Sequence, residues 1–184
     1  MSPDDGRPRV GISRCLLGDE VRYDGGHKRD GLLLSSLGSL VQWVPVCPEV
    51  EAGMGTPREP IHLVASEHGV PAGNARARLL GVHTGRDWTH TMSAFVTARV
   101  RELAEQQLDG YVCKADSPSC GLEQVRVHGG AETARSGRGL FAQALVTAFP
   151  DLPVEEDRRL SDRAVRERFL ERVLAHRRLR LARR

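Results

Sequence analysis

The stretch Tyr111-Val-Cys-Lys-Ala-Asp-Ser-Pro-Ser-Cys-Gly121 decides how the fold is interpreted, because an apolar run leads directly into a polar turn. Gly110 precedes the run and Gly121 closes the turn, so the pattern predicts a short buried strand, Tyr111–Lys114, followed by a loop that carries Cys120. Loops at strand ends carry functional side chains more often than packing residues. The alternative is an ordinary turn with an inert buried thiol, and the stretch alone does not decide between the two.

Two other apolar runs in the chain also lead to a cysteine. The run Arg9–Ser13 is followed by Cys15, and Val41–Val46 leads into Cys47. Both runs have the length and composition of short strands, although Pro45 indicates that the second is irregular at its end. Three predicted strands are therefore each followed by a cysteine.

Helical periodicity separates these strands. Apolar residues recur at every third or fourth position between Asp87 and Gln107, with Asp87 as the expected cap. Ser161 is the expected cap of a last helix, whose apolar stripe consists of Val165, Phe169, Leu170, Val173 and Leu174. The remaining expectations are helices over 32–40 and 139–149, paired strands at 61–64 and 79–83, a Gly-rich loop from His128 to Arg138, and an edge strand at 152–154.

Strands that alternate with helices predict an α/β fold, here a layered, Rossmann-like, mostly parallel sheet flanked by helices, with a C-terminal helical extension. Ligands in such folds bind beyond the carboxyl ends of the strands. A parallel sheet would therefore bring Cys15, Cys47 and Cys120 to one edge. Cys113 lies inside its predicted strand and is assigned to packing.

The length and charge of the chain limit its class. A length of 184 residues, 40% of them hydrophobic, is enough for one domain with a substantial core. Of the net charge of +3, the segment 155–184 contributes +5, from 11 Arg against 6 Asp and Glu, so residues 1–154 carry about −2. We therefore expect a domain over 1–154 and a basic C-terminal helix over 155–184. Because neither a membrane-spanning run nor a signal peptide is apparent, the expected location is cytoplasmic, where cysteines serve metals, catalysis or packing more often than disulfides.

Three thiolates from distant loops can hold a zinc ion or an iron–sulfur cluster. Because the chain has no CxxC motif, spacing alone leaves inert thiols and a regulatory disulfide open as alternatives. Glu49 follows Cys47 by two residues, and Ser117 and Ser119 precede Cys120, so a carboxylate and two hydroxyls are expected near the thiols. A carboxylate can relay protons or position water, and a hydroxyl can donate to a leaving atom. The alternatives are a solvated charge and hydrogen bonds that shape a turn.

Several motifs in order give the chain a family resemblance over roughly residues 9–150. They are Val10-Gly-Ile-Ser-Arg-Cys-Leu-Leu-Gly18, Val21-Arg-Tyr-Asp-Gly25, Cys47-Pro-Glu49, Thr56-Pro-Arg58 and Lys114-Ala-Asp-Ser-Pro-Ser-Cys-Gly121. Together they resemble the TudS family of thiouracil desulfidases, formerly a domain of unknown function. The resemblance implies a [4Fe–4S] cluster that Cys15, Cys47 and Cys120 hold, with one iron not bound by cysteine. It also implies that Glu49 and Ser117 form the catalytic pair.

The segment from Leu152 to Val173 is similar to the junction in longer relatives, the RudS-type desulfidases that remove sulfur from 4-thiouridine in tRNA. The second domain of those fused relatives would begin where this sequence ends, at Arg184. The Arg-rich tail could assist RNA binding, although a solvated helix face explains it equally well. Aromatic residues make up only 4% of the chain, so stacking platforms for RNA are sparse.

These observations give a hypothesis for the reaction of a thiolated pyrimidine, free or within tRNA. Glu49 would activate a water that attacks the thiolated carbon, Ser117 would assist proton transfer, and hydrogen sulfide and uracil or uridine would be the products. The candidates for contacts to the base or to a phosphate are Arg22, Tyr23, Arg58, Lys114 and Ser119. The alternative is a cysteine-ligated metal or cluster module with a structural or sensing role. No membrane association and no obligate protein partner are expected.

Overall fold

Four parallel strands form the central sheet of the protein, called sheet A. The computed structural model describes residues 6–65, 77–129 and 132–183. The strand order is β2-β1-β5-β8, and every neighbouring pair is parallel. The strands are β1 (Arg9–Ser13), β2 (Gln42–Val46), β5 (Gly110–Cys113) and β8 (Val154–Glu156). The three strands expected before the cysteines are confirmed, and the expected edge strand lies two residues later than predicted.

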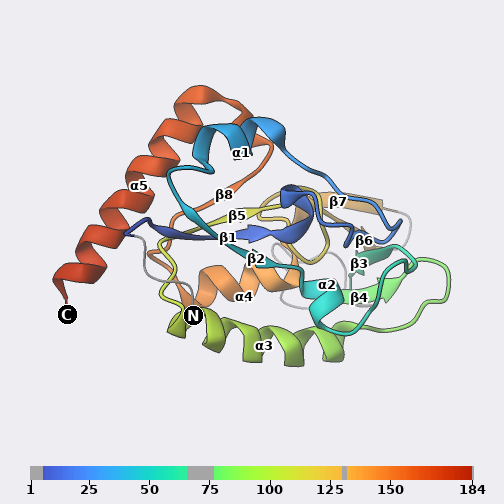
Figure 1. Cartoon of the computed structure of the whole chain (residues 1–184). Helices are drawn as coiled ribbons and strands as arrows, with labels where there is room; N and C mark the ends of the chain where they lie inside the picture. Colours follow the sequence, from blue (N-terminus) through green and yellow to red (C-terminus); the bar gives the residue numbers. More distant parts are fainter. Residues whose placement is uncertain (1–5, 66–76, 130–131, 184) are drawn as a thin grey trace.

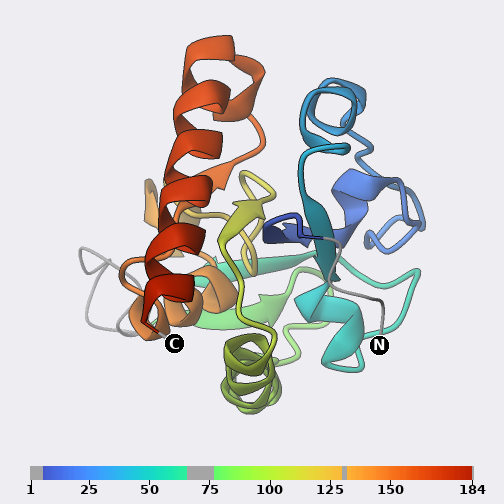
Figure 2. The same ribbon diagram turned by 60° about the vertical axis from the view of Figure 1, so that its left-hand side comes forward.

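Helices cover both faces of sheet A, which gives the α/β layers expected from the sequence (Figure 1). Figure 2 shows α5, in red, and α3, in green, on different sides of the sheet. One face carries α1 (Gly31–Leu37) and α5 (Arg163–Ala182), and the other carries α3 (Thr89–Glu105) and α4 (Leu140–Ala148). Short helices follow three strands, namely η1 (Arg14–Leu17), α2 (Pro48–Glu51) and η2 (Arg159–Ser161).

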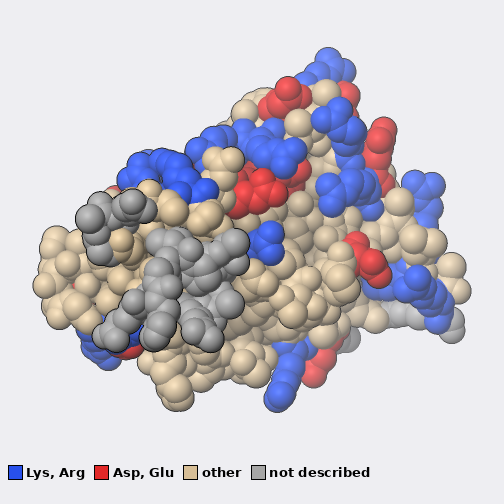
Figure 3. Space-filling model, turned by 180° about the vertical axis from the view of Figure 1, so that it is seen from behind, with Lys and Arg blue, Asp and Glu red and all other residues tan. Residues whose placement is uncertain are grey.

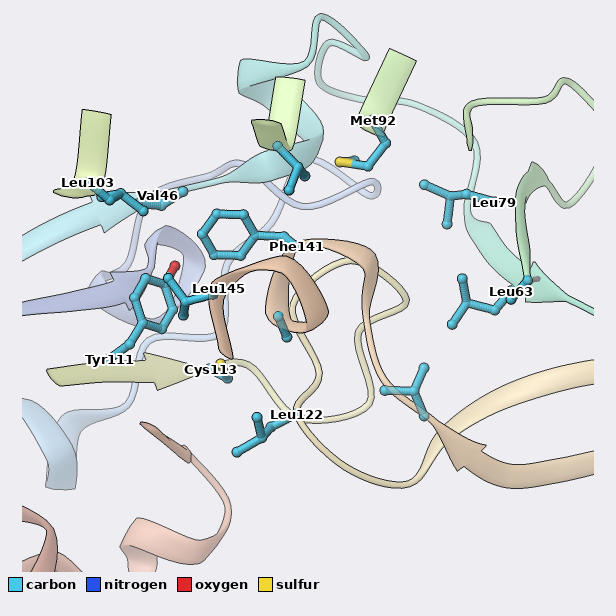
Figure 4. Close-up of a cluster of buried hydrophobic side chains, with 14 of the residues drawn as sticks. Val46, Leu63, Leu79, Met92, Leu103, Tyr111, Cys113, Leu122, Phe141 and Leu145 are labelled. Atoms are coloured by element: carbon cyan, nitrogen blue, oxygen red, sulfur yellow. The ribbon is translucent and has the colours of Figure 1, made fainter. Parts of the chain in front are cut away.

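Strand alternation divides the apolar residues between two cores. In β5, Val112 packs with α1 and α5, whereas Tyr111 and Cys113 point to the other face, toward α3 and α4. The rings of Tyr111 and Phe141 have centroids 5.6 Å apart (Figure 4). A Cβ at Gly11 would lie 2.2 Å from the Tyr111 ring, so only glycine at this position of β1 leaves room for the ring to pack against the strand. Cys113 is fully buried in this core, as expected for a packing residue.

A second sheet of four strands follows the order β4-β3-β6-β7. Its strands β3 (Ile61–Val64) and β4 (Arg78–Gly81) pair antiparallel, as expected. The prediction of a loop from His128 to Arg138 is wrong, because β6 (Val125–Gly129) and β7 (Glu132–Gly137) form an antiparallel pair there. Val125 and Val127 are buried and Arg126 between them is exposed, so the strand has the period of two that the glycines of this segment obscured.

Two helix starts differ from the prediction. The N-cap of α3 is Trp88, and Asp87 lies one residue before it. Asp87 accepts a hydrogen bond at 2.9 Å from the N–H of Thr89, the first helical residue, whereas an N-cap side chain accepts from the second or third. The N-cap of α5 is Asp162, whose carboxylate accepts from the Val165 N–H at 3.1 Å. The Ser161 hydroxyl instead donates to the Arg158 carbonyl, so a carboxylate replaces the expected hydroxyl at this helix start.

The C-terminal segment packs on sheet A. Phe169 and Val173 of α5 are buried against it, and Arg177 and Arg180 form ion pairs with the fully buried Asp109. Helix α5 begins at Arg163, and β8 of sheet A precedes it. The division of the chain into a domain over 1–154 and a basic segment over 155–184 stays a prediction. No helix in the described part of the chain has the length and apolar character of a membrane span.

Candidate functional site

The three predicted ligand cysteines line one cavity of about 550 Å³ at the carboxyl ends of the strands in sheet A. Cys15 lies in η1 directly after β1, and Cys47 directly follows β2. Cys120 lies in the loop after β5. The placement of these residues at strand ends predicted this convergence, because parallel strands share one carboxyl edge.

Local hydrogen bonds fix Cys47 at the start of α2. Cys47 is the N-cap in extended conformation, and Pro48 occupies the first helical position, where no N–H donor is needed. The side chain of Glu51, one position beyond that of a capping-box residue, reaches back and accepts from the Cys47 N–H at 2.8 Å. Arg99 of α3 forms an ion pair with the same carboxylate at 3.1 Å. The cysteine is thereby tied to the helix layer beneath the sheet.

Carboxylates at the end of β8 hold both ends of the Cys120 loop. Asp157 accepts from the Ala115 N–H at 2.7 Å and from the Lys114 ammonium at 2.8 Å. Glu156 is buried and accepts from the backbone N–H groups of residues 122–123 at 2.9 and 3.1 Å. Sequence analysis missed both residues, because their partners are about 30 to 40 positions away and no local pattern marks them.

The N-terminus of α4 holds the middle of the same loop. The Leu140 N–H donates to the Pro118 carbonyl at 3.2 Å, and the Phe141 N–H donates to the Ser119 carbonyl at 3.0 Å. First-turn N–H groups lack partners within a helix, so the loop satisfies donors that would otherwise be unpaired. Gly139 makes the close approach possible, because a Cβ there would lie 2.3 Å from the Ser119 carbonyl carbon.

We expect Gly139→Ala to displace the Cys120 loop and to lower the free energy of unfolding by about 1–3 kcal/mol, as overpacking does. The new methyl group meets backbone atoms, which cannot rotate away. Chemical denaturation measures the change. Gly31→Ala is the matched control, because no atom lies within 4 Å of a Cβ built there. Equal stability of both variants would contradict this account of the α4 contact.

Burial keeps the three thiols protonated when no cation is bound. It raises the pKa of Cys15 to about 11, with a further contribution from the nearby Cys47. Burial is also the main cause that raises the pKa of Cys47, and burial together with Glu49 raises that of Cys120. All three cysteines are free of disulfides. A bound cationic centre would be needed to make them thiolates near neutral pH.

The donor set is three cysteine thiols at one cavity, which is the chemistry that binds iron–sulfur clusters. Within the described ranges, no group of three His, Cys, Asp or Glu side chains is arranged to hold a single metal ion. In a [4Fe–4S] cluster each cysteine thiolate binds a different iron. Three thiols from separate loops at one cavity are a donor set that suits such a cluster.

Glu49 and Ser117, the predicted catalytic pair, both line the cavity. Their link is indirect: the Ser119 hydroxyl donates to Glu49 Oε1 at 2.5 Å and lies 3.1 Å from Ser117 Oγ. Ser119 itself is fully buried. Glu49 also forms an ion pair with Arg58, another residue that lines the cavity. The structure thus brings all four side chains together at one side of the cavity.

The remaining candidates lie at the same cavity. Arg22 and Tyr23 lie on its wall, with the Arg22 guanidinium carbon 5.3 Å from the Tyr23 ring centroid. Tyr23 is partly exposed, so its ring is accessible. The Lys114 ammonium is paired with Asp157, and Lys28, which sequence analysis did not single out, also lines the cavity.

The chain is similar to known proteins in its sequence and in its fold. The model of a family described as 2-thiouracil desulfurase matches residues 10–157. The chain is 30% identical over 110 residues to the uncharacterized protein YbbK of Bacillus subtilis (strain 168), which covers 60% of this chain and 71% of that protein. It is also similar to the solved structure of the [4Fe-4S]-dependent thiouracil desulfidase TudS, with a TM-score of 0.63 and 26% identity over 84% of this chain and 94% of that one.

Proposed function

The chain belongs to the 2-thiouracil desulfurase family, and from this premise we propose that it is a [4Fe–4S]-dependent desulfidase of thiolated pyrimidines. The reaction replaces the thiocarbonyl sulfur by the oxygen of water and releases hydrogen sulfide. The observation that carries the proposal is the convergence of three free thiols and the Glu49 carboxylate on one cavity. The similarity to a solved [4Fe-4S]-dependent thiouracil desulfidase supports the choice of cluster.

Cys15, Cys47 and Cys120 would hold the cluster. The chain has four cysteines, and the fourth, Cys113, is fully buried in the core between sheet A and the helices α3 and α4. One iron would therefore have no cysteine ligand. When bound, such a cluster supplies a Lewis-acidic iron for a soft sulfur donor.

The protein's own residues would carry the proton steps. Glu49 takes a proton from a water that adds to the thiolated carbon, and Ser117 assists proton transfer toward the sulfur. The carbon–sulfur double bond is replaced by a carbon–oxygen double bond, and both protons of the water leave with sulfur as hydrogen sulfide. The balance requires no electron donor or acceptor.

The substrate within this class is a free base, a nucleoside or 4-thiouridine in tRNA. Two arginines of the basic tail, Arg177 and Arg180, bind Asp109 before β5, at the edge opposite the cavity. On the face seen in Figure 3, basic side chains alternate with acidic ones. Arg158, however, is exposed and pairs with Asp116 on the cavity wall, which favours tRNA as a second candidate. RNA binding draws most of its affinity from contacts between basic side chains and phosphates. Because Arg177 and Arg180 of the tail pair with Asp109 at the edge opposite the cavity, we place the free base first.

We expect the anaerobically reconstituted protein to release sulfide from 2-thiouracil or 4-thiouracil. Sulfide release measured in parallel with tRNA that contains 4-thiouridine separates the two substrate classes. A tRNA transcript without thiolated bases is the control for sulfide lost from the cluster itself. No release from any of the three substrates by protein with a full cluster would overturn the proposed function.

A further inference from the structure

The Glu49 carboxylate is held from two sides by buried donors. Arg58 pairs with Oε2, and the Ser119 hydroxyl donates to Oε1 at 2.5 Å. The side chain of Arg58 is 7% exposed and Ser119 is completely buried, so water competes weakly for either contact. Hydrogen bonds to an ionised acceptor are the strongest that side chains make, and two of them leave the carboxylate one orientation.

Arg58 uses its terminal donors on the protein. While Nη2 faces Glu49, Nη1 donates to the Val21 carbonyl at 3.1 Å and to the Gly55 carbonyl at 2.7 Å. Its backbone N–H donates to the Tyr23 carbonyl at 2.9 Å, which fixes the base of the side chain. The guanidinium group therefore connects Glu49 to two loops and has few donors left for a substrate.

Ser119 connects the two predicted catalytic residues. A hydroxyl has one proton, and that of Ser119 points to Glu49, so the 3.1 Å contact with Ser117 requires the Ser117 hydroxyl to donate. The Ser117 oxygen in turn accepts the Cys120 N–H at 3.1 Å. The order of donation runs from Ser117 through Ser119 to Glu49, and the buried Ser119 stands behind the cavity wall.

We propose that Arg58 and Ser119 are positioning residues that fix the Glu49 carboxylate, and that neither binds the substrate. This inference rests on the proposed function, in which Glu49 activates water. Since both residues act through Glu49, their loss moves the carboxylate relative to the bound base and leaves the base's own contacts in place. Small misplacements of a reacting group cost up to about 100-fold in rate.

Arg58→Gln and Ser119→Ala are expected to lower kcat by about 10- to 100-fold and to leave KM within about threefold. The dissociation constant of uracil, measured by calorimetry, and the iron content per chain should match those of the wild type. Arg78→Gln is the control, because Arg78 also pairs with a carboxylate, Asp87, but on the exposed surface away from the cavity. It should change none of these quantities.

A double-mutant cycle completes the test. In a Glu49→Ala background, Arg58→Gln and Ser119→Ala should cause no further loss of kcat, because the residue through which they act is gone. Ser119→Ala removes only one hydroxyl and carries the test if Arg58→Gln lowers the folded fraction. Raised KM, weakened uracil binding and unchanged kcat would overturn the inference while the function stands. A wild-type protein that releases no sulfide would overturn both.

Discussion

Glu49→Gln is expected to lower sulfide release by about 10²- to 10⁴-fold, the range that general acid–base catalysis contributes. The amide has almost the shape of the carboxylate and lies at the same cavity wall, but it cannot take a proton from water. Cluster content should stay at the wild-type level, because Glu49 is not one of the three thiol donors. Turnover by methylene-blue detection of sulfide, together with iron analysis of the same sample, measures both quantities.

The variant also separates the two classes of function considered for this chain. A module that holds a metal or cluster for structure or sensing does not need Glu49, and would lose nothing measurable. Glu102→Gln is a suitable control, because Glu102 is an exposed carboxylate on α3 that pairs with Arg99 outside the cavity. Full activity in Glu49→Gln would exclude the proposed role of this carboxylate.

Cys120→Ser and Cys113→Ser should have opposite effects, although the two thiols lie only seven positions apart. Cys120→Ser removes one of the three proposed ligands, so the reconstituted protein should lack most of its cluster absorbance and all sulfide release. Cys113→Ser should keep the cluster. It should nevertheless lower the free energy of unfolding by about 1–3 kcal/mol, because it places a hydroxyl in a fully buried apolar core.

Visible absorbance and an iron content on the order of four per chain report the cluster, and denaturation of the cluster-free proteins reports stability. Comparing the cluster-free forms removes the contribution of ligand binding to stability. A cluster that survives Cys120→Ser but not Cys113→Ser would reverse the assignment of ligand and packing residue.

The convergence of Cys15, Cys47 and Cys120 at one edge of sheet A could be predicted from the sequence, because that prediction needs only short-range information. Each apolar run identifies a strand, and a cysteine follows the end of each strand. Because parallel strands end at the same edge of a sheet, the three cysteines lie at that edge. The burial of Cys113 followed in the same way from its position inside the run at 111–114. The strand periodicity of β6 and β7 was not apparent in the sequence, because the glycines at positions 129 and 130 obscured this antiparallel pair.

Contacts between distant segments lay beyond sequence reasoning. Glu156 and Asp157 hold the Cys120 loop, yet on the sequence they belong to a run of acidic residues at the start of a basic segment. Likewise, the motifs make Ser119 and Arg58 candidates for substrate contacts, because nothing in a sequence shows to which atoms a side chain donates. The hydrogen-bond partners of both residues, which the structure gives, support the proposal that they position Glu49.

The attachment of α5 to Asp109 has a practical consequence for handling the protein. Arg177 of this helix also donates to the backbone carbonyl of Arg7, so both ends of the described chain lie at the amino edge of sheet A, whereas the cavity opens at the carboxyl edge (Figure 1). An affinity tag or a fluorescent label fused after α5 would project away from the cavity mouth. Protein immobilised through such a tag would present the cavity to solution, so that sensor-based binding of bases and of large RNAs can be compared without obstruction by the support.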